Sequence, residues 1–381
     1  MQHRGVTPTG GVNVDNLREL GSADTSSVTV LLSTDPAEAN PGPRWEQRWK
    51  TARRELEGRG ADAGALEQLD DAAIDAYRRG DVFYAVADPT RLWLSETWTG
   101  EVRAEILRVS ALPSLAPLLA HRQREVPHVV ALVDRQGADV VAVEREGEVH
   151  DGQVAGEGGA VIRKSGPGGW SQRRYQDRAE ESWARTAESI AETLTSTVDR
   201  IDAQLIVLAG DVRELQLVRQ ALPDRLADRV HVIDGGRAAG TDEAARDHEV
   251  ERLLETAVAD ATVGILRKLR EELGQHDRGV VGTAPTFDAL RKAQVEVLLV
   301  HDDVDDGRTA WFGVAPTTIG VTEEEARDVE PDDGAREPRE ARLADVAIRA
   351  AIGTGADVRV VPSVHALPDG LGAILRWSDG A

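Results

Sequence analysis

One long amphipathic stretch constrains the fold more than any other part of the sequence. Within Ser171–Arg200, apolar residues recur at spacings of three and four, which predicts one long helix with a single buried face. The stripe consists of Trp183, Ala187, Ile190, Leu194 and Val198. A short apolar strand, Leu205–Ala209, follows directly. A helix and a buried strand in this order indicate a layered α/β domain.

Strands and helices alternate along the rest of the chain as well. The expected N-terminal elements are strands at 28–33, 82–87, 92–97 and 102–109 and helices at 45–56, 65–79 and 112–124. In the middle, strands are expected at 128–133, 138–144, 148–150 and 230–233, a Gly-rich loop at 151–169, and helices at 212–221 and 247–273. Near the C-terminus we expect helices at 282–292 and 342–352 and strands at 295–300, 309–313, 357–361 and 373–377.

These elements predict an α/β fold class with mixed sheets layered with helices and a three-domain architecture. The predicted parts are a flexible tail at 1–27, an N-terminal α/β domain at 28–125, a middle domain at 126–273 and a C-terminal α/β domain at 274–381. The segment at about 322–340 is rich in Glu, Asp and Pro and is expected to be a solvated acidic insertion.

Composition narrows the classes of function. The formal net charge of -22 argues against a simple nucleic-acid coat, because phosphate binding depends on Lys and Arg. No apolar run reaches the roughly 18 residues that span a bilayer, and the N-terminus lacks a signal-peptide pattern. We therefore expect a soluble, cytoplasmic protein with no membrane partner. The absence of Cys excludes disulfides, thiolate metal sites and a Cys nucleophile.

Motifs for cofactors and metals are incomplete. Gly235–Thr241 has the glycine spacing of a phosphate-binding loop but lacks its Lys. His248 and Glu249 are adjacent, whereas two metal ligands on one helix face lie three or four positions apart. His301, Asp302 and Asp303 stand at the end of a strand, and a cation site is one interpretation of them; the one we adopt is a solvated acidic turn at Asp302–Asp306. The sequence therefore predicts no cofactor, no metal site and no catalytic residue of a standard enzyme motif.

The segment Val161–Gln176 inverts the charge of the chain, because it contains basic residues and no acid. Its glycines allow close approach of the backbone to a partner, and Trp170 is suited to stacking on a base. Ser171 is a candidate N-cap of the long helix, whose first turns carry arginines that can reach phosphates. The alternative is a solvated surface loop whose arginines pair with Glu180 and Glu181.

Residues Gly168–Tyr175 resemble the Gly-Gly-Gln loop of the eukaryotic and archaeal class-one peptide-chain release factors. Three further segments resemble the same family in the same order: Leu205–Gly210, Phe287–Val300 and Leu371–Trp377. The resemblance covers about residues 126–381 and implies the three-domain fold of these factors.

Two departures bear on the function that the resemblance implies. Trp170 stands at the position of the family's Gln, which places a water at the ester of peptidyl-tRNA; an indole has one N–H donor and no acceptor oxygen. Gln172 and Gln176 are shifted by two and six positions. The family's stop-codon-reading Asn-Ile-Lys-Ser motif is absent from the first domain. The resemblance therefore implies neither peptide release nor codon-directed termination.

A release-factor-like body without release chemistry resembles the bacterial, actinobacterial branch of the family, which is linked to ribosome hibernation. The resemblance implies a factor in the A site of an idle 70S ribosome, with the first domain in the decoding centre and the loop toward the peptidyl-transferase centre. It also implies the tRNA-delivering elongation factor as a second partner. The predicted rRNA contacts are Lys164, Gly168, Gly169, Trp170, Ser171, Arg173 and Arg174.

Two alternative functions stay open. A peptidyl-tRNA hydrolase or rescue factor on stalled ribosomes would use Gln172 or Gln176 as a displaced catalytic Gln. An off-ribosome protein that binds tRNA or another RNA would share only the fold, because fold alone does not determine function.

Overall fold

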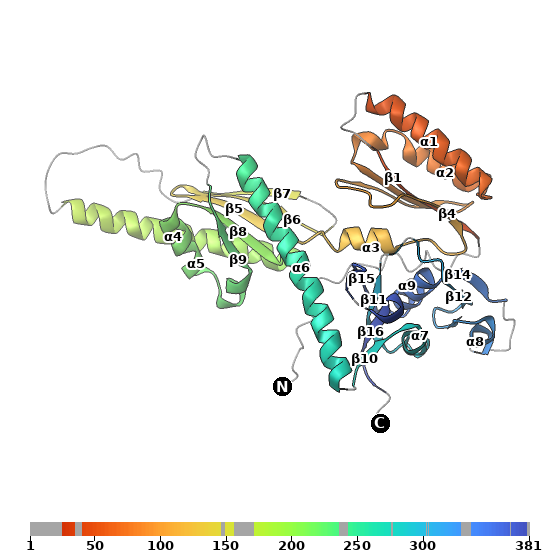
Figure 1. Ribbon diagram of the computed structural model, residues 1–381. Coiled ribbons are helices and arrows are strands. Elements are labelled where there is room, and N and C mark those ends of the chain that lie inside the picture. The colour runs from red at the N-terminus through yellow and green to blue at the C-terminus, as the bar shows by residue number, and fades with distance from the viewer. Residues whose placement is uncertain are drawn as a thin grey trace. The chain divides into compact units, whose positions relative to one another are not determined.

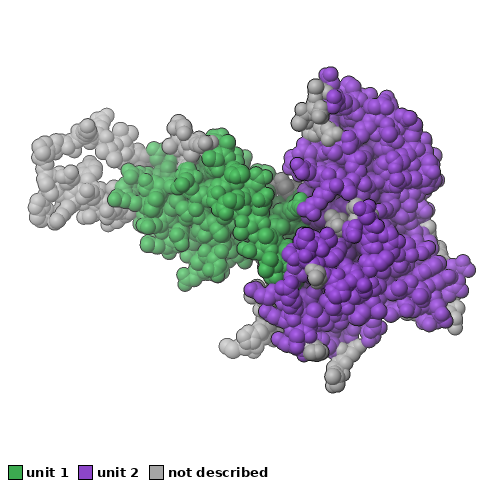
Figure 2. Space-filling view, in the orientation of Figure 1, with its two compact units in different colours: residues 1–10, 122–265 green, residues 11–121, 266–381 purple. Residues whose placement is uncertain are grey.

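The computed structural model describes residues 25–34, 40–145, 149–155, 171–235, 243–275, 277–301, 303, 305–328, 337–365 and 367–378, with the backbone alone at 155 and 171–182. The chain divides into two compact units (Figure 2). The middle unit contains Arg122–Ile265, and the terminal unit combines the described parts of Gly11–His121 and Leu266–Ala381. Both units are mixed α/β, so the predicted fold class is confirmed.

The middle unit is built on a five-stranded sheet of order β7-β6-β5-β8-β9 (Figure 1). Strands β5, β6 and β7 form an antiparallel meander, and β8 and β9 continue the sheet parallel to β5. The strands are β5 (His128–Asp134), β6 (Gly137–Val143), β7 (Val149–Ala155), β8 (Leu205–Gly210) and β9 (Val230–Ile233). The parallel pair β5–β8 requires a long crossover, which the α4 helix supplies.

Helices cover both faces of this sheet. On one face, α4 (Ser171–Ile201) and α5 (Val212–Ala221) enclose a core with the inward-facing residues of β5, β6 and β8. On the other face, α6 (Glu243–Gln275) packs through Val250, Leu253 and Leu254. The predicted long helix and its buried stripe are confirmed from Ala187 onward.

The N-terminal part of the terminal unit is an antiparallel sheet of order β3-β2-β1-β4, so β3 is an edge strand. Two helices, α1 (Pro41–Gly58) and α2 (Ala63–Ala73), share a core with one face of this sheet (Figure 1). The strands are β1 (Ser27–Ser33), β2 (Val82–Ala87), β3 (Leu92–Trp98) and β4 (Ile106–Ser110), and α3 (Ala116–Arg122) follows them.

The C-terminal part contains two sheets, of order β10-β16-β11-β15 and β13-β12-β14. Only the pair β11–β15 is parallel. The strands are β10 (Gly279–Val281), β11 (Val295–His301), β12 (Thr309–Phe312), β13 (Ile319–Gly320), β14 (Arg339–Arg342), β15 (Asp357–Val361) and β16 (Leu371–Leu375). The helices are α7 (Thr283–Arg291), α8 (Glu323–Asp328) and the buried α9 (Leu343–Gly353).

A single hydrophobic core joins the N-terminal sheet to the C-terminal elements, although they are far apart in sequence. It includes Tyr84, Leu118 and Leu119 from the first part and Phe287 and Ile348 from the second. Polar side chains lie within the same region: the Ser114 hydroxyl donates to the Asp345 carboxylate at 3.1 Å and accepts from Arg108 at 2.8 Å. The terminal unit is therefore one packed body made from both ends of the chain.

Three predicted elements require correction. The helix expected to reach Arg79 ends at Ala73 and is followed by a short 3-10 turn, because Asp75 adopts a left-handed conformation with φ 55°. The loop expected from Asp151 starts later, because β7 pairs with the whole of β6 up to Ala155. The expected acidic insertion at 322–340 contains α8, whose Ala326 is buried, and the start of β14; residues 329–336 lie outside the described residues.

Candidate functional site

The predicted RNA-contacting loop lies largely outside the described residues. Lys164, Gly168, Gly169 and Trp170 belong to the segment 156–170, of which nothing is described. Ser171, Gln172, Arg173, Arg174 and Gln176 form the first two turns of α4, described by their backbone. At a rise of about 1.5 Å per residue, Gln176 lies about 7.5 Å along the helix axis from Ser171. The two candidate glutamines are four residues apart on the same helix, about 6 Å along its axis and slightly more than one turn.

The α4 helix that follows the loop is anchored to the sheet over its second half. Ala187, Ile190, Leu194 and Val198 are at most 5% exposed and pack on β5, β6 and β8. At 31 residues the helix is about 46 Å long. Trp183 lies about 18 Å from the start of the helix, at 1.5 Å per residue.

Trp183, predicted as part of the buried stripe, is instead half-buried, and an arginine side chain lies over its ring. The Arg135 guanidinium lies over its ring, 4.8 Å from the centroid. Arg135 Nε also donates to Glu214 Oε1 at 3.0 Å. Glu214 is 5% exposed, whereas the Arg135 side chain is 60% exposed. These three residues come from the turn after β5, from α4 and from α5, so they tie the loop-bearing helix to the sheet.

The start of α5 fixes the Glu214 carboxylate in this cluster. Asp211 Oδ1 accepts the Arg213 backbone N–H at 3.0 Å and so caps the helix. That backbone hydrogen bond is the main cause that holds the pKa of Asp211 below its usual range. Just before the cap, a Cβ at Gly210 would lie 2.3 Å from the Val133 carbonyl oxygen, so only glycine lets β8 approach β5 this closely.

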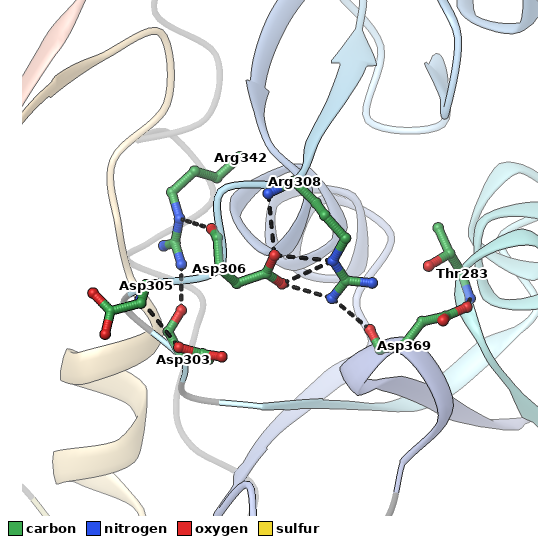
Figure 3. A network of polar contacts seen from close by, with 7 residues as sticks. All are labelled: Thr283, Asp303, Asp305, Asp306, Arg308, Arg342 and Asp369. Carbon is green, nitrogen blue, oxygen red and sulfur yellow. Dashed lines mark hydrogen bonds and ion pairs between the residues drawn. The ribbon is translucent and has the colours of Figure 1, made fainter.

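A second polar cluster lies in the C-terminal part of the terminal unit (Figure 3). Arg308 makes bonds of 2.9 and 2.6 Å to the two carboxylate oxygens of Asp306, and it also donates to the Asp369 carbonyl at 2.7 Å. Arg342 donates to the carbonyls of Asp303 at 2.6 Å and Asp306 at 3.2 Å. The Arg308 hydrogen bonds hold the pKa of Asp306 below its usual range. The acidic turn, expected to be solvated, is thus pinned by two arginines.

This pinned turn borders an open cavity of about 330 Å³. His301, Asp369 and Leu343 contribute to its walls. The His301 ring contacts the His365 carbonyl oxygen at 2.8 Å through Nε2, and Asp369 Oδ2 accepts the Thr283 N–H at 3.1 Å. Within the described part of the chain, no group of three or more His, Asp or Glu is arranged to hold a metal ion. The arrangement joins loops of the C-terminal part by ion pairs and hydrogen bonds.

Sequence reasoning missed the residues that tie α4 to the sheet. Arg135 stands in a polar turn and Glu214 on a short charged helix, 79 residues away. The one available signal was the position of Glu214, which lies one residue before the buried Leu215 and four before the buried Val218. That position places the carboxylate toward the core, where a charge requires a partner.

Residues 127–275 match the model of bacterial archaeo-eukaryotic release factor family 2. The match contains the candidate loop, α4 and the whole sheet of the middle unit. This part of the chain is release-factor-like. It makes up less than half of the chain, so the match does not by itself assign the N-terminal and C-terminal parts.

Curated relatives extend the similarity. The uncharacterized protein Rv2629 of Mycobacterium tuberculosis is 27% identical over 379 residues, covering 96% of each chain. A protein pelota homolog of Natronomonas pharaonis is 24% identical over 168 residues. That alignment covers 43% of this chain and 45% of the homolog, so it spans less than half of either protein.

Solved structures of related factors were also found. The Pelota of Archaeoglobus fulgidus is 14% identical, with 98% of this chain and 95% of that chain covered and a TM-score of 0.35. Dom34 of S. cerevisiae, described as a translation termination-like factor, is 10% identical, with 76% of this chain and 74% of Dom34 covered and a TM-score of 0.40. At these scores the likenesses add no weight to the assignment. Among the described helices, none is long and apolar enough to cross a membrane.

Proposed function

We propose that this protein is a ribosome-binding hibernation factor that occupies the A site of idle ribosomes without releasing peptide. The observation that carries the proposal is Trp170, which stands in place of the catalytic Gln in a segment otherwise like the release-factor loop. An indole N–H donates one hydrogen bond and accepts none, so it does not orient a water for ester hydrolysis as an amide does. The loop therefore serves as an RNA contact.

The release-factor-like family match supports this proposal, because it includes both the loop and the helix behind it. The anchoring of α4 supports it further. A helix fixed to a sheet by a buried stripe and by the Arg135–Glu214 ion pair presents its N-terminal end from a rigid base. We propose Lys164, Gly168, Gly169, Trp170, Ser171, Arg173 and Arg174 as the rRNA contacts.

The first test is sedimentation of the full chain with vacant 70S ribosomes, followed by cryo-electron microscopy of the complex. We expect density in the A site, with Gly168–Trp170 reaching the peptidyl-transferase centre and the first domain in the decoding centre. The double variant Arg173→Ala with Arg174→Ala should weaken binding. The double variant Lys50→Ala with Arg54→Ala, which removes two exposed cations from α1, is the matched control for the loss of positive charge. An empty A site would refute the proposal.

A second assay addresses chemistry. We expect no hydrolysis of peptidyl-tRNA on 70S ribosomes above the uncatalysed rate. Turnover that falls with Gln172→Ala or Gln176→Ala would replace the proposal with the hydrolase or rescue-factor alternative. Binding to free tRNA in preference to ribosomes would favour the off-ribosome alternative.

Salt dependence measures how much of the binding rests on the basic loop. On a chain of net charge -22, only a few phosphate contacts are expected. For each contact, log K falls by roughly 0.7–0.9 per unit of log salt, so the three basic residues predict a fall of about 2–3.

The tRNA-delivering elongation factor is proposed as a second partner. If it escorts the protein, adding it should increase the amount of protein retained on ribosomes. The three-domain division is likewise a proposal, which limited proteolysis near residues 125 and 273 would test.

A further inference from the structure

The turn between β2 and β3 holds an arginine over an indole ring. The Arg91 guanidinium carbon lies 3.2 Å from the centroid of the Trp93 ring, which is stacking distance. Arg91 is exposed and Trp93 is half-buried. Trp93 also packs against the core of the terminal unit, so the position of the ring is set from inside the protein.

A buried carboxylate fixes both members of this pair. Asp88, 2% exposed, accepts the Trp93 indole N–H through Oδ2 at 2.7 Å. Its Oδ1 accepts the Arg91 backbone N–H at 3.0 Å, the Thr90 backbone N–H at 2.7 Å and the Thr90 hydroxyl at 2.6 Å. Burial acts to raise the pKa of Asp88, but these hydrogen bonds outweigh it and leave the pKa below its usual range. The carboxylate therefore stays ionised and holds the turn.

The backbone of the turn is also closed. The Asp88 N–H donates to the Arg91 carbonyl at 3.0 Å. On the other side, a Cβ at Gly64 would lie 2.6 Å from the Pro89 carbonyl oxygen, so the start of α2 rests directly against the turn. Little conformational freedom remains to be lost on binding, which favours a preorganised contact.

We propose that Arg91, stacked on Trp93, is a platform on which an RNA base stacks. The indole N–H is occupied by Asp88, so the indole offers no hydrogen bond to a partner; what the pair presents is a flat, cationic, polarizable surface. Proteins recognise unpaired bases with such planes, made of aromatic rings or arginine guanidinium groups. Stacking on every base's π-face is tolerant of sequence, so the platform suits a binder that reads no codon.

The proposal rests on the proposed function for the source of the base, which would be ribosomal RNA. It adds an RNA contact in the first domain, where the sequence contains no recognisable RNA-binding motif. The partner is an unpaired base rather than a phosphate, because a phosphate is bound by the guanidinium N–H groups in the plane of the group and does not need the indole behind it, whereas a base uses the face that the stacked pair presents. An acidic protein segment would likewise depend on charge and not on the plane.

The test uses the full chain with Arg91→Ala, Arg91→Lys and the control Arg54→Ala. Affinity is measured for vacant 70S ribosomes and, separately, for fluorescein-labelled hexa-adenylate RNA and a strand of the same length without bases. Loss of one stacked base lowers affinity by roughly 5- to 150-fold. We expect a loss in this range for both Arg91 variants on ribosomes and on hexa-adenylate, less than a twofold change for Arg54→Ala, and weak binding of the strand without bases. Circular dichroism and thermal unfolding establish that each variant is folded.

The outcomes separate the platform from the proposed function. If hexa-adenylate binding depends on Arg91 while ribosomes are not bound, the platform stands and the ribosomal proposal fails. If ribosomes are bound but Arg91→Lys binds as tightly as the unmodified chain, only charge is used and the platform is refuted. The platform is also refuted if the strand without bases binds as tightly as hexa-adenylate, or if Arg91→Ala and Arg54→Ala lose the same affinity. The absence of binding to every probe would refute it as well.

Discussion

Among the described residues, two arginines lie over tryptophan rings, one in each compact unit, and the two pairs differ in how they are held in place. In the middle unit, Arg135 over Trp183 is bound to Glu214, which comes from another element 79 residues away. In the terminal unit, Arg91 and Trp93 are two residues apart, and the carboxylate Asp88 holds the indole and the backbone of the turn. The first pair joins three elements, whereas the second belongs to one turn.

The difference shows how the same pair of residues can stabilise packing or present a surface. Arg135 has its charge matched by a buried carboxylate, so its removal affects the folded state first. Arg91 is positioned by bonds that Asp88 makes to its backbone, so its side chain can be changed without breaking the turn. The following predictions test this contrast, beginning with the carboxylate that holds the second pair.

Asp88→Ala is expected to have the largest effect. It removes four hydrogen bonds to an ionised, buried acceptor, and the free energy of unfolding of the terminal unit should fall by about 4 kcal/mol. Denaturant unfolding measures the loss. Asp88→Asn, which keeps the acceptor Oδ1, is the control and should lose less than half as much. Equal losses in the two variants would mean that the charge, and not the set of bonds, holds the turn.

Asp345 is a buried carboxylate with fewer hydrogen-bond partners than Asp88, and its pKa is shifted in the opposite direction. It is 3% exposed, receives one hydrogen bond from Ser114 and faces Arg342 at 3.7 Å; Arg108 also lies near it. Burial raises its pKa to about 6, with the two arginines and Ser114 opposing the shift. The folded state thus binds its proton more tightly than the unfolded state does.

The free energy of unfolding of the terminal unit should therefore fall as pH rises from about 4 to 6, by at most about 3 kcal/mol. Above pH 6 the contribution of Asp345 no longer changes with pH. Asp88, whose pKa is lowered, acts in the other direction and loses its contribution only below about pH 4. Unfolding curves at closely spaced pH values measure both. Asp345→Asn should remove the decline between pH 4 and 6; a decline that persists would assign it to other groups.

Arg135→Met should lower the stability of the middle unit by about 2 kcal/mol, because Glu214 then keeps its buried charge without its partner. The estimate lies below that for a fully buried pair, because the arginine side chain is largely exposed. Hydrogen exchange should increase in α4 and α5 and stay unchanged in β11 and β15. Adding Glu214→Gln to the variant should recover part of the loss, and a double variant no more stable than the single one would contradict the role of the ion pair.

The regular parts of the fold were predictable because their signals are local. The stripe from Ala187 to Val198 follows the helical period, and in Val295–Val300 every residue except Glu296 is apolar; both gave the correct element. The last turn of the expected helix to Arg79 was wrong, because the left-handed conformation of Asp75 is not signalled by its neighbours.

The side-chain clusters were not predictable, because their members are distant in sequence. Arg135 meets Glu214 across 79 residues, and Ser114 meets Asp345 across 231. No periodicity encodes such pairs. For the candidate loop, by contrast, the sequence did give a signal, because its composition and its resemblance to the release-factor loop indicated RNA contact. Its assignment stays a prediction, because Lys164–Trp170 lie outside the described residues.

Arg91→Met should have the smallest effect on stability and so completes the contrast with Arg135→Met. The substitution keeps an unbranched apolar stem, and all four Asp88 hydrogen bonds remain possible, because the one to residue 91 is made by its backbone. The substitution removes the cation–π contact, which at an exposed site is worth about 0.5–1 kcal/mol. Denaturant unfolding of the two Met variants in parallel measures the difference. A loss for Arg91→Met as large as that for Arg135→Met would make Arg91 a structural tie, and its exposed plane would then be a by-product of folding.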